Sequence, residues 1–319
     1  MKILVYIQQD QGNISSISLE ALKGAQEIVA QTGGTVTAIT FNSQTSTKLT
    51  AYDLTEILLI EDEALNIYKP LHFIKAMEEV VTAESPNCIV FGHSYEARDW
   101  VPRLSARMDI PFISDCFNFK IDDELTFIRS IYQGKFNADW VFGEGSYIVS
   151  FQSGAFRADS LKAGSASVRN VSVDLSCVAD SIKPGEKFQE AEKSVDLSQA
   201  KIIVSVGRGI GKEENLQLVY DLSNALGAEV ASSRPVVDSG WLEPYHQVGS
   251  SGQTVAPNLY LALGISGAIQ HVVGMNSSKN IVAINKDVNA PIFEIADYAV
   301  VGDIFEIVPK LITAIQGSK

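Results

Sequence analysis

Glycines, hydroxyl side chains and isolated charges gather in short segments over the last third of the chain. The first segment, residues 207–211, reads Gly-Arg-Gly-Ile-Gly between an apolar strand-like run and a helix-like run. Backbone N–H groups in such a turn, with the dipole of the helix that follows, favour a phosphate or ribose. Arg208 adds a cation. The spacing departs from the dinucleotide fingerprint, because Lys212 stands where a further small residue is expected.

The second and third segments add a cation and more hydroxyl groups. In residues 231–241, Arg234 stands where a dinucleotide fold would carry an acidic residue, and Pro235 follows it. An arginine fixed in this way can hold a permanent positive charge against an anionic or electron-rich ring. In residues 247–257, glycines flank Ser250 and Ser251 and offer N–H groups and hydroxyls at close range.

The remaining segments also lie where strands are expected to end. Residues 264–271 form a strand-to-helix turn, and His271 in its helix is a candidate donor to a developing anion. Asn285 ends a further strand, and Asp303 follows the last one, where an acid could bind ribose or adenine. Any one segment could be an ordinary turn, a surface ion pair or a structural histidine. Together they predict a long ligand of dinucleotide size across a sheet edge.

The elements around these segments predict a doubly wound α/β sheet. Such sheets bind ligands at the carboxyl ends of their strands, which is where the five segments fall. The expected strands are 201–206, 229–231, 259–264, 281–285 and 298–301. The expected helices are 213–226, 268–274 and 304–315.

The first half of the chain also alternates strand-like and helix-like runs, which predicts a parallel sheet. Its expected strands are 3–7, 35–41, 56–60 and 88–92, and its expected helices are 18–31, 71–83 and one from 93–94 through 107. Four short runs, 112–119, 126–131, 140–142 and 147–151, have hairpin-like spacing and predict an antiparallel extension. The polar segment 186–198 predicts a linker, so we expect two α/β domains, 1–190 and 191–319.

Composition excludes several classes of function. The 319 residues carry a net charge of −13 and no basic run, which argues against a nucleic-acid partner. The cysteines, Cys88, Cys116 and Cys177, are too sparse for a metal cluster or a disulfide framework, and we expect buried free thiols. No targeting segment precedes the first strand and no apolar run could span a bilayer. We therefore expect a cytoplasmic protein with no membrane partner.

Motifs in the last third resemble those of the alpha subunit of electron transfer flavoproteins. The matching residues are Ser233-Arg234-Pro235 with Asp238, Gln247-Val248-Gly249 with Gly252, Leu259-Tyr260 with Gly264 to His271, and Ala283 to Asp287 with Ala290 to Phe293. The match is dense over 204–309, whereas the first half is similar only in layout. The resemblance implies that the C-terminal domain binds FAD. It also implies a beta subunit that completes the site and carries AMP, or a second FAD in an electron-bifurcating version.

The resemblance also implies roles for individual residues. Arg208 would contact the nucleotide part of FAD, and Ser233 and Arg234 would lie beside the isoalloxazine, where the cation favours the reduced, anionic ring. The loop residues that would wrap the flavin and ribityl chain are Val248, Gly249, Ser250 and Ser251, with Ser251 near N5. The residues that would cradle phosphate and the pyrimidine side are Ser266, Gly267, Ala268, Ile269, Gln270 and His271, with His271 near the C2 carbonyl. The residues that would hold the adenosine end are Asn285, Asp303 and Ile304.

One loop departs from the family pattern. The family often has Gln-Thr-Gly-Lys where this chain has Ser250-Ser251-Gly252-Gln253. Ser251 keeps the hydroxyl, but Gln253 removes a positive charge, which would change the flavin potential or the pyrophosphate contact.

We expect an electron carrier, because no acid–base pair, nucleophile triad or metal cluster is visible. Its transient partners would be flavin dehydrogenases, as in fatty acid beta-oxidation, and an acceptor such as a quinone oxidoreductase. An NAD(P)-dependent oxidoreductase is a second hypothesis, which the absent fingerprint and ribose-binding acid disfavour. An adenine-nucleotide sensor built from residues 1–190 is a third.

Overall fold

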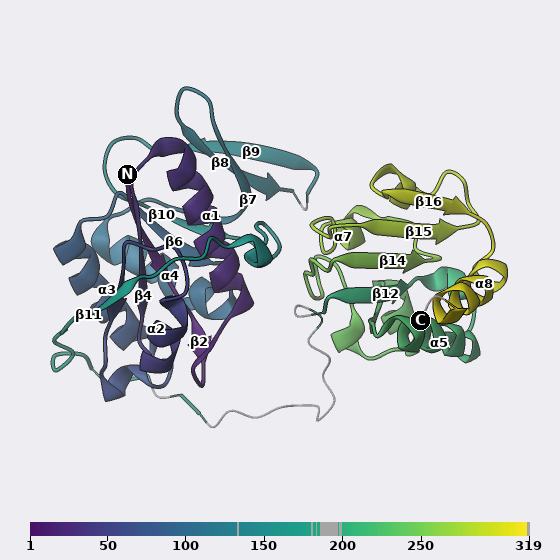
Figure 1. Ribbon diagram of the computed structural model, residues 1–319, viewed down its shortest axis with the longest axis horizontal. Helices are drawn as coiled ribbons and strands as arrows, with labels where there is room; N and C mark the ends of the chain where they lie inside the picture. The colour runs from purple at the N-terminus through teal and green to yellow at the C-terminus, as the bar shows by residue number, and fades with distance from the viewer. Residues whose placement is uncertain (133, 180, 183, 186–196, 198–199, 318–319) are drawn as a thin grey trace. The chain divides into compact units, whose positions relative to one another are not determined.

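The chain forms two compact units, each with its own sheet (Figure 1). The first comprises Met1–Ser130 and Asn137–Phe188, and the second comprises Ile131–Phe136 and Gln189–Lys319. The computed structural model describes residues 1–319 except 133, 180, 183, 186–196, 198–199 and 318–319. The boundary expected between residues 190 and 191 therefore lies outside the described residues.

The N-terminal unit is built on a mixed nine-stranded sheet of order β11-β5-β4-β1-β6-β10-β7-β8-β9. Its strands are β1 (Lys2–Tyr6), β4 (Thr35–Thr40), β5 (Glu56–Leu59), β6 (Cys88–Gly92), β7 (Phe112–Ile121), β8 (Leu125–Ile131), β9 (Phe136–Val141), β10 (Tyr147–Phe151) and β11 (Ser167–Asn170). A separate ribbon pairs β2 (Gln9–Asp10) with β3 (Asn13–Ile14). The helices are α1 (Ser16–Thr32), α2 (Ser43–Leu49), α3 (Pro70–Glu84) and α4 (Tyr95–Met108), with short 3-10 turns η1 (Glu63–Leu65) and η2 (Ala158–Ser160).

Two cores cover the two faces of this sheet. Successive side chains of a strand point to opposite faces. Ile3 and Val5 of β1 accordingly pack in the core that α1 covers. Leu4 and Tyr6 pack in the core formed with α3 and α4, where Trp100 is fully buried. The central strands are thus buried on both sides, as the apolar runs predicted.

The expectation that residues 147–151 belong to an antiparallel extension was wrong, because these residues form the parallel strand β10. It pairs in parallel with β6 on one side and with β7 on the other, so that Ile148 lies opposite both Ile89 and Phe112. Antiparallel pairing is found between β7 and β8, where Phe119 faces Phe127. The alternation of apolar residues identifies a strand but is the same for both directions, and the excursion through β7, β8 and β9 brings the chain back to the start of a parallel strand.

Among the elements that were missed in the sequence are a helix and an edge strand of the N-terminal unit. The helix α2 begins after Asn42, whose side chain accepts from the backbone N–H of Thr45 at 3.0 Å, and that capping signal could have identified it. The edge strand β11 is exposed along its whole length and has no apolar alternation to mark it.

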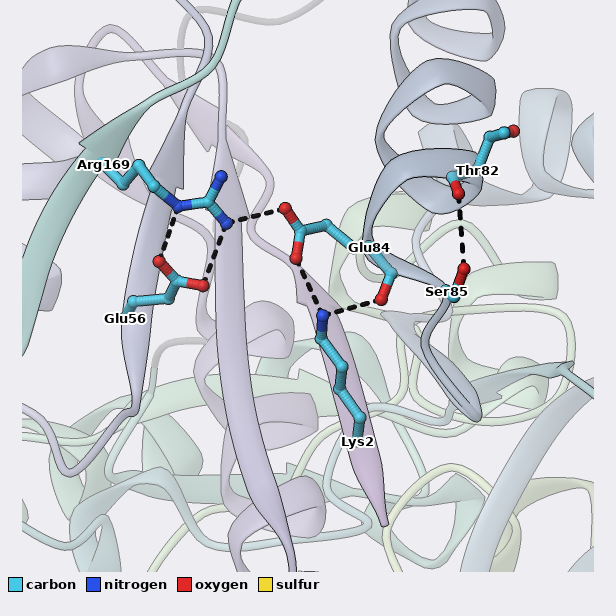
Figure 2. Close-up of polar contacts among 6 residues, drawn as sticks. All are labelled: Lys2, Glu56, Thr82, Glu84, Ser85 and Arg169. Atoms are coloured by element: carbon cyan, nitrogen blue, oxygen red, sulfur yellow. Dashed lines mark hydrogen bonds and ion pairs between the residues drawn. The ribbon is translucent and has the colours of Figure 1, made fainter.

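An ion-pair network fixes β11 to the sheet (Figure 2). Arg169 of β11 places Nε 2.7 Å from Glu56 Oε2 and its terminal nitrogen 2.6 Å from Glu84 Oε1. Lys2 Nζ lies 2.8 Å from Glu84 Oε2 and 2.7 Å from the Glu84 carbonyl oxygen. Hydrogen bonds from Lys2 and Arg169 lower the pKa of Glu84. Lys2 and Glu56 begin their strands, so the network lies at the amino ends, away from the edge where α/β sheets bind ligands.

The C-terminal unit is built on a parallel five-stranded sheet of order β13-β12-β14-β15-β16. Its strands are β12 (Ile202–Val206), β13 (Glu229–Ser232), β14 (Leu259–Leu263), β15 (Ile281–Asn285) and β16 (Tyr298–Val301). The helices are α5 (Leu216–Leu226), α6 (Arg234–Asp238), α7 (Ile269–Val272) and α8 (Ile304–Gly317), with 3-10 turns η4 (Arg208–Ile210), η5 (Glu213–Asn215), η6 (Pro244–His246) and η7 (Pro291–Glu294). The expected doubly wound α/β sheet is confirmed, although the helix expected over 268–274 is only the single turn α7.

The direction in which strands are added reverses between β12 and β14, which makes this the switch point of the sheet. One face packs Val204 and Val206 against α5 and α8. The other face packs Tyr260 and Ala262 against the loops that carry the polar segments. The expected segments therefore come together on one side of the switch point.

Two expectations drawn from the composition concern the burial of the cysteines and the presence of membrane-spanning helices. Cys88 and Cys116 are buried thiols as expected, whereas Cys177 is exposed, so the expectation was wrong there. Among the described helices, not one combines the length and the apolar character needed to cross a bilayer.

Candidate functional site

Glycines bring the loops after β12 and β14 into direct contact. Gly207 N–H donates to the Leu263 carbonyl at 2.8 Å, and Gly209 N–H donates to the Gly264 carbonyl at 3.1 Å. A Cβ on Gly207 would lie 2.3 Å from the Gly264 oxygen, so no larger residue fits there. The two loops consequently form one continuous surface at the switch point.

The turn after β14 leaves backbone donors free. In the described part of the chain, the N–H groups of Ser266, Gly267 and Ala268 donate to no acceptor. The turn is held by the Ser266 carbonyl, which accepts from Ile292 N–H at 3.1 Å. Gly267 has a φ of +88° and a Cβ there would lie 2.2 Å from the Ile292 nitrogen. Successive free N–H groups of this kind form an anion-binding concavity.

His271 lies below this turn with one ring nitrogen unpaired. Its side chain is buried, and Nε2 lies 3.0 Å from the hydroxyl oxygen of Tyr260. Nδ1 is buried and has no hydrogen-bond partner among the described residues. Burial lowers the pKa of His271 to about 4, partly opposed by the backbone of Val248. The imidazole is therefore neutral at pH 7 and carries one N–H.

The loop 247–253 packs its backbone against α7 and β13. Val248 N–H donates to the Ser232 carbonyl at 3.0 Å, and Ser250 N–H donates to the Gln270 carbonyl at 2.7 Å. Gly249 is buried between them. The loop thus places its exposed serines beside the α7 turn.

Two of the residues that depart from the family pattern, Ser251 and Gln253, have structural partners. Ser251 Oγ accepts from Gln247 Nε2 at 2.9 Å, which leaves its own hydroxyl proton free to donate. The Gln253 side chain donates to the Tyr245 carbonyl at 2.6 Å and accepts from Leu197 N–H at 3.1 Å. Gln253 therefore fixes the loop, a task that its position in the sequence did not reveal.

Two arginines present exposed cations near the carboxyl ends of β12 and β13. The side chain of Arg208 makes no hydrogen bond or ion pair with the described residues. Arg234 is the first residue of α6, and its Nε lies 3.3 Å from Asp238 Oδ2. The positive charge of Arg234 is thus paired with the carboxylate of Asp238, one helical turn further along. Ser233, which precedes it, is buried and donates its N–H to the Val206 carbonyl at 3.0 Å.

The residues expected at the adenosine end also stabilise their own turns. Asn285 donates from Nδ2 to the Ile265 carbonyl at 2.9 Å. Asp303 Oδ1 accepts from Phe305 N–H at 2.9 Å, at the start of α8. The side chain of Ile304 is buried in the core with α5, so it can meet a ligand only through its backbone.

The expected site residues divide by exposure in a way that suits a bound ligand. The exposed ones are Arg208, Arg234, Ser250, Ser251, Ser266, Ala268, Ile269, Gln270 and Asp303. The buried ones are Ser233, Val248, Gly249, Gly267, His271 and Ile304, and Asn285 is intermediate. Tyr260 had no expected role, because its place in a buried strand pointed only to packing.

Two family models match the chain. The electron transfer flavoprotein domain matches residues 3–176, and the electron transfer flavoprotein FAD-binding domain matches residues 196–276. The chain is 34% identical to the electron transfer flavoprotein subunit alpha of Bacillus subtilis, over 97% of this chain and 96% of that protein. This chain belongs to the electron transfer flavoprotein alpha subunit family. It is an electron carrier with an FAD-binding domain.

Two further relatives widen the comparison. Protein FixB of Clostridium saccharobutylicum is 34% identical over 97% of this chain and 95% of its own length. Subunit LctC of the lactate dehydrogenase (NAD(+),ferredoxin) of Acetobacterium woodii is 31% identical over 99% of this chain and 77% of its own length.

The chemistry of the strand ends fits FAD. Among the described residues, three consecutive N–H groups without an acceptor suit a phosphate oxygen, and the buried, unpaired Nδ1 of His271 suits a ring carbonyl. Both lie in the turn after β14 and the helix that follows it. This set of donors therefore suits a ligand that is both anionic and aromatic.

Proposed function

We propose that this alpha subunit holds FAD along the carboxyl ends of β12, β14 and β15 and passes electrons singly between flavoproteins. The observation that carries the proposal is the turn after β14 and the helix that follows it. Among the described residues, the N–H groups of Ser266, Gly267 and Ala268 have no acceptor and His271 Nδ1 has no partner. A buried polar group without a partner costs roughly 1–3 kcal/mol, so a ligand that satisfies it gains that much.

The residues of the chain would divide the work of binding. Arg208 and the free N–H groups would neutralise phosphate, and Asn285, Asp303 and the backbone of Ile304 would hold the adenosine end. When bound, FAD supplies the capacity to accept and release electrons. The chain's own part is to stabilise negative charge on the ring, through Arg234, through Ser251 and the loop that packs on α7, and through a neutral donor at His271.

Flavin content tests this function. The chain co-produced with its beta subunit should purify as a coloured complex whose visible absorbance gives one FAD for each alpha subunit. A colourless complex that turns over a nicotinamide substrate would instead support the NAD(P)-dependent alternative and end this proposal.

The role of Arg234 has its own test. We expect Arg234→Ala to lower the midpoint potential of the flavin by about 60 mV, the one-electron equivalent of a tenfold change in equilibrium. Arg103→Ala is the matched control, because Arg103 also forms an exposed pair one helical turn away, with Asp99 at 2.8 Å, in the other unit. An Arg234→Ala potential equal to that of the control would remove Arg234 from the flavin site.

The partners follow from the family. We propose a heterodimer with a beta subunit, dehydrogenases as electron donors and a quinone oxidoreductase as one possible class of acceptor. Similarity to LctC, named for NAD(+) and ferredoxin, favours a second candidate in which the beta subunit carries a further flavin. The nucleotides released on denaturing the purified heterodimer decide between them: FAD and AMP in equal amounts, or two FAD.

A further inference from the structure

The hydroxyl of Tyr260 and the imidazole of His271 form a buried pair. Tyr260 lies on β14 with 0% of its surface exposed, and His271 lies on α7 with 6% exposed. Tyr260 Oη is 3.0 Å from His271 Nε2. Since the other ring nitrogen has no partner among the described residues, this one bond controls where the imidazole proton resides.

Two arrangements are compatible with that distance. Either His271 donates from Nε2–H to Tyr260, or Tyr260 donates its hydroxyl proton to Nε2 and the imidazole proton resides on Nδ1. A neutral imidazole has one donor and one acceptor nitrogen, so the first arrangement leaves a bare lone pair on Nδ1 and the second leaves a free N–H there.

The surroundings favour the second arrangement. The N–H of Val248 is already donated to the Ser232 carbonyl, so it is not free to serve a lone pair on Nδ1. Among the described residues, the Tyr260 hydroxyl has no hydrogen-bond partner other than His271, and Ser205 Oγ is unpaired. If His271 donated, the buried hydroxyl proton of Tyr260 would have no acceptor, and a buried donor without a partner is costly. The phenolic hydroxyl therefore donates to His271.

We propose that Tyr260 is a positioning residue for His271: its hydroxyl donates to Nε2 and thereby keeps the imidazole proton on Nδ1. The free Nδ1–H is then a fixed neutral donor. That this donor serves a carbonyl of the flavin rests on the function proposed above. Without the Tyr260 hydroxyl, the ring would populate both tautomers and the donor would be present only part of the time.

The tautomer can be measured directly. The heterodimer is prepared with 15N-labelled histidine, and the signals of His271, one of the four histidines of this chain, are identified by their loss in His271→Gln. Nitrogen shifts distinguish a protonated from an unprotonated ring nitrogen. We expect a protonated Nδ1 and an unprotonated Nε2 in the wild type, and intermediate shifts for both nitrogens in Tyr260→Phe. Tyr6→Phe, which removes another buried hydroxyl in the other unit, should leave the His271 signals unchanged.

The outcomes separate this proposal from the function. A protonated Nε2 in the wild type overturns it, as do His271 signals that are the same in Tyr260→Phe. If Tyr260→Phe does not fold, the wild-type shifts still decide, because the two arrangements protonate different nitrogens. FAD affinity is a second readout, and we expect Tyr260→Phe to weaken it three- to tenfold. A wild-type heterodimer without FAD would end the proposed function and leave the tautomer assignment intact.

Discussion

Each unit of this chain has a strand-to-helix turn that carries a histidine, and the two turns treat their polar groups differently. In the N-terminal unit the turn joins β6 to α4 and contains His93. In the C-terminal unit the turn joins β14 to α7 and leads into His271. Both turns follow a parallel strand that adjoins the switch point of its sheet, and burial lowers the pKa of both histidines.

The N-terminal turn satisfies its own polar groups. His93 N–H donates to the Phe151 carbonyl at 2.8 Å, and His93 Nδ1 lies 2.9 Å from Ser150 Oγ. Ser94 caps α4 by accepting from Ala97 N–H at 3.1 Å. A ligand would have to displace these bonds, so the turn gives no support to the hypothesis of a nucleotide sensor in residues 1–190.

The C-terminal turn leaves the corresponding groups open. Ser266, Gly267 and Ala268 have free N–H groups in the described chain, and Ala268 cannot cap α7 with a side chain. The difference teaches that the fold alone does not require unpaired donors at a strand end. Where they persist, a ligand is the expected partner. In the first unit, four buried side-chain atoms also lack a partner among the described residues, namely Thr40 Oγ1, Thr45 Oγ1, Trp100 Nε1 and Arg129 Nε.

We expect the largest effect on FAD binding from a substitution in the C-terminal turn, which joins β14 to α7. In Gly267→Ala, the new methyl group meets the Ile292 backbone at a φ that disfavours side chains. We expect FAD affinity to fall about 100-fold, equivalent to about 3 kcal/mol, by titration of the apo heterodimer. Gly143→Ala, whose Cβ would meet nothing within 4 Å, is the control. Equal affinities in both variants would show that the turn does not bind the cofactor.

A partly buried carboxyl group of the N-terminal unit predicts a dependence of stability on pH. Glu20 Oε2 accepts from Gly154 N–H at 2.6 Å, after β10, and burial raises its pKa to about 7. The folded chain therefore holds a proton that the unfolded chain releases above pH 4.5, so the free energy of unfolding falls as pH rises from 4.5 to 7. The fall is at most about 3 kcal/mol.

Glu20→Gln should remove that slope. Urea unfolding at pH 5 and pH 7.5 measures it, with Glu144→Gln at an exposed position as the control. A slope that persists in Glu20→Gln would show that other groups, and not Glu20, bind the proton.

One substitution can remove hydrogen bonds from the N-terminal turn, which joins β6 to α4 and contains His93. Ser150→Ala removes the partner of His93 Nδ1 and the acceptor of Asp115 N–H, which lies 3.1 Å from Ser150 Oγ. We expect the free energy of unfolding to fall by about 2 kcal/mol, with no change in FAD content. Ser43→Ala, at an exposed serine, should be nearly neutral. Loss of FAD from Ser150→Ala would contradict the division of roles between the two turns.

We expect the smallest effect on FAD binding from removal of the positive charge of Arg208. Arg208→Gln should weaken FAD binding about fivefold, or about 1 kcal/mol, and added salt should reduce the difference. Stability without FAD should be unchanged, because Arg208 has no partner among the described residues. Lys212→Gln removes a neighbouring exposed charge. If both variants weaken binding equally, the general positive field and not Arg208 accounts for the effect.

The sequence by itself determined the elements and the segments of the site. Short apolar runs located β1, β4, β6 and the C-terminal strands within a residue or two, since that pattern is local to each element. The glycine and serine segments placed the candidate ligand at the strand ends, because loops after parallel strands meet at one edge. The family resemblance came from the same residues.

The tertiary structure decided what depends on contacts between distant residues. The parallel direction of β10, the contact of Gly207 with Gly264 and the pairing of Arg234 with Asp238 require the folded chain. Tyr260 appeared as a packing residue until its hydroxyl was found beside His271. A hydrogen bond satisfied or left open depends on the positions of two groups, and a local sequence pattern specifies only one of them.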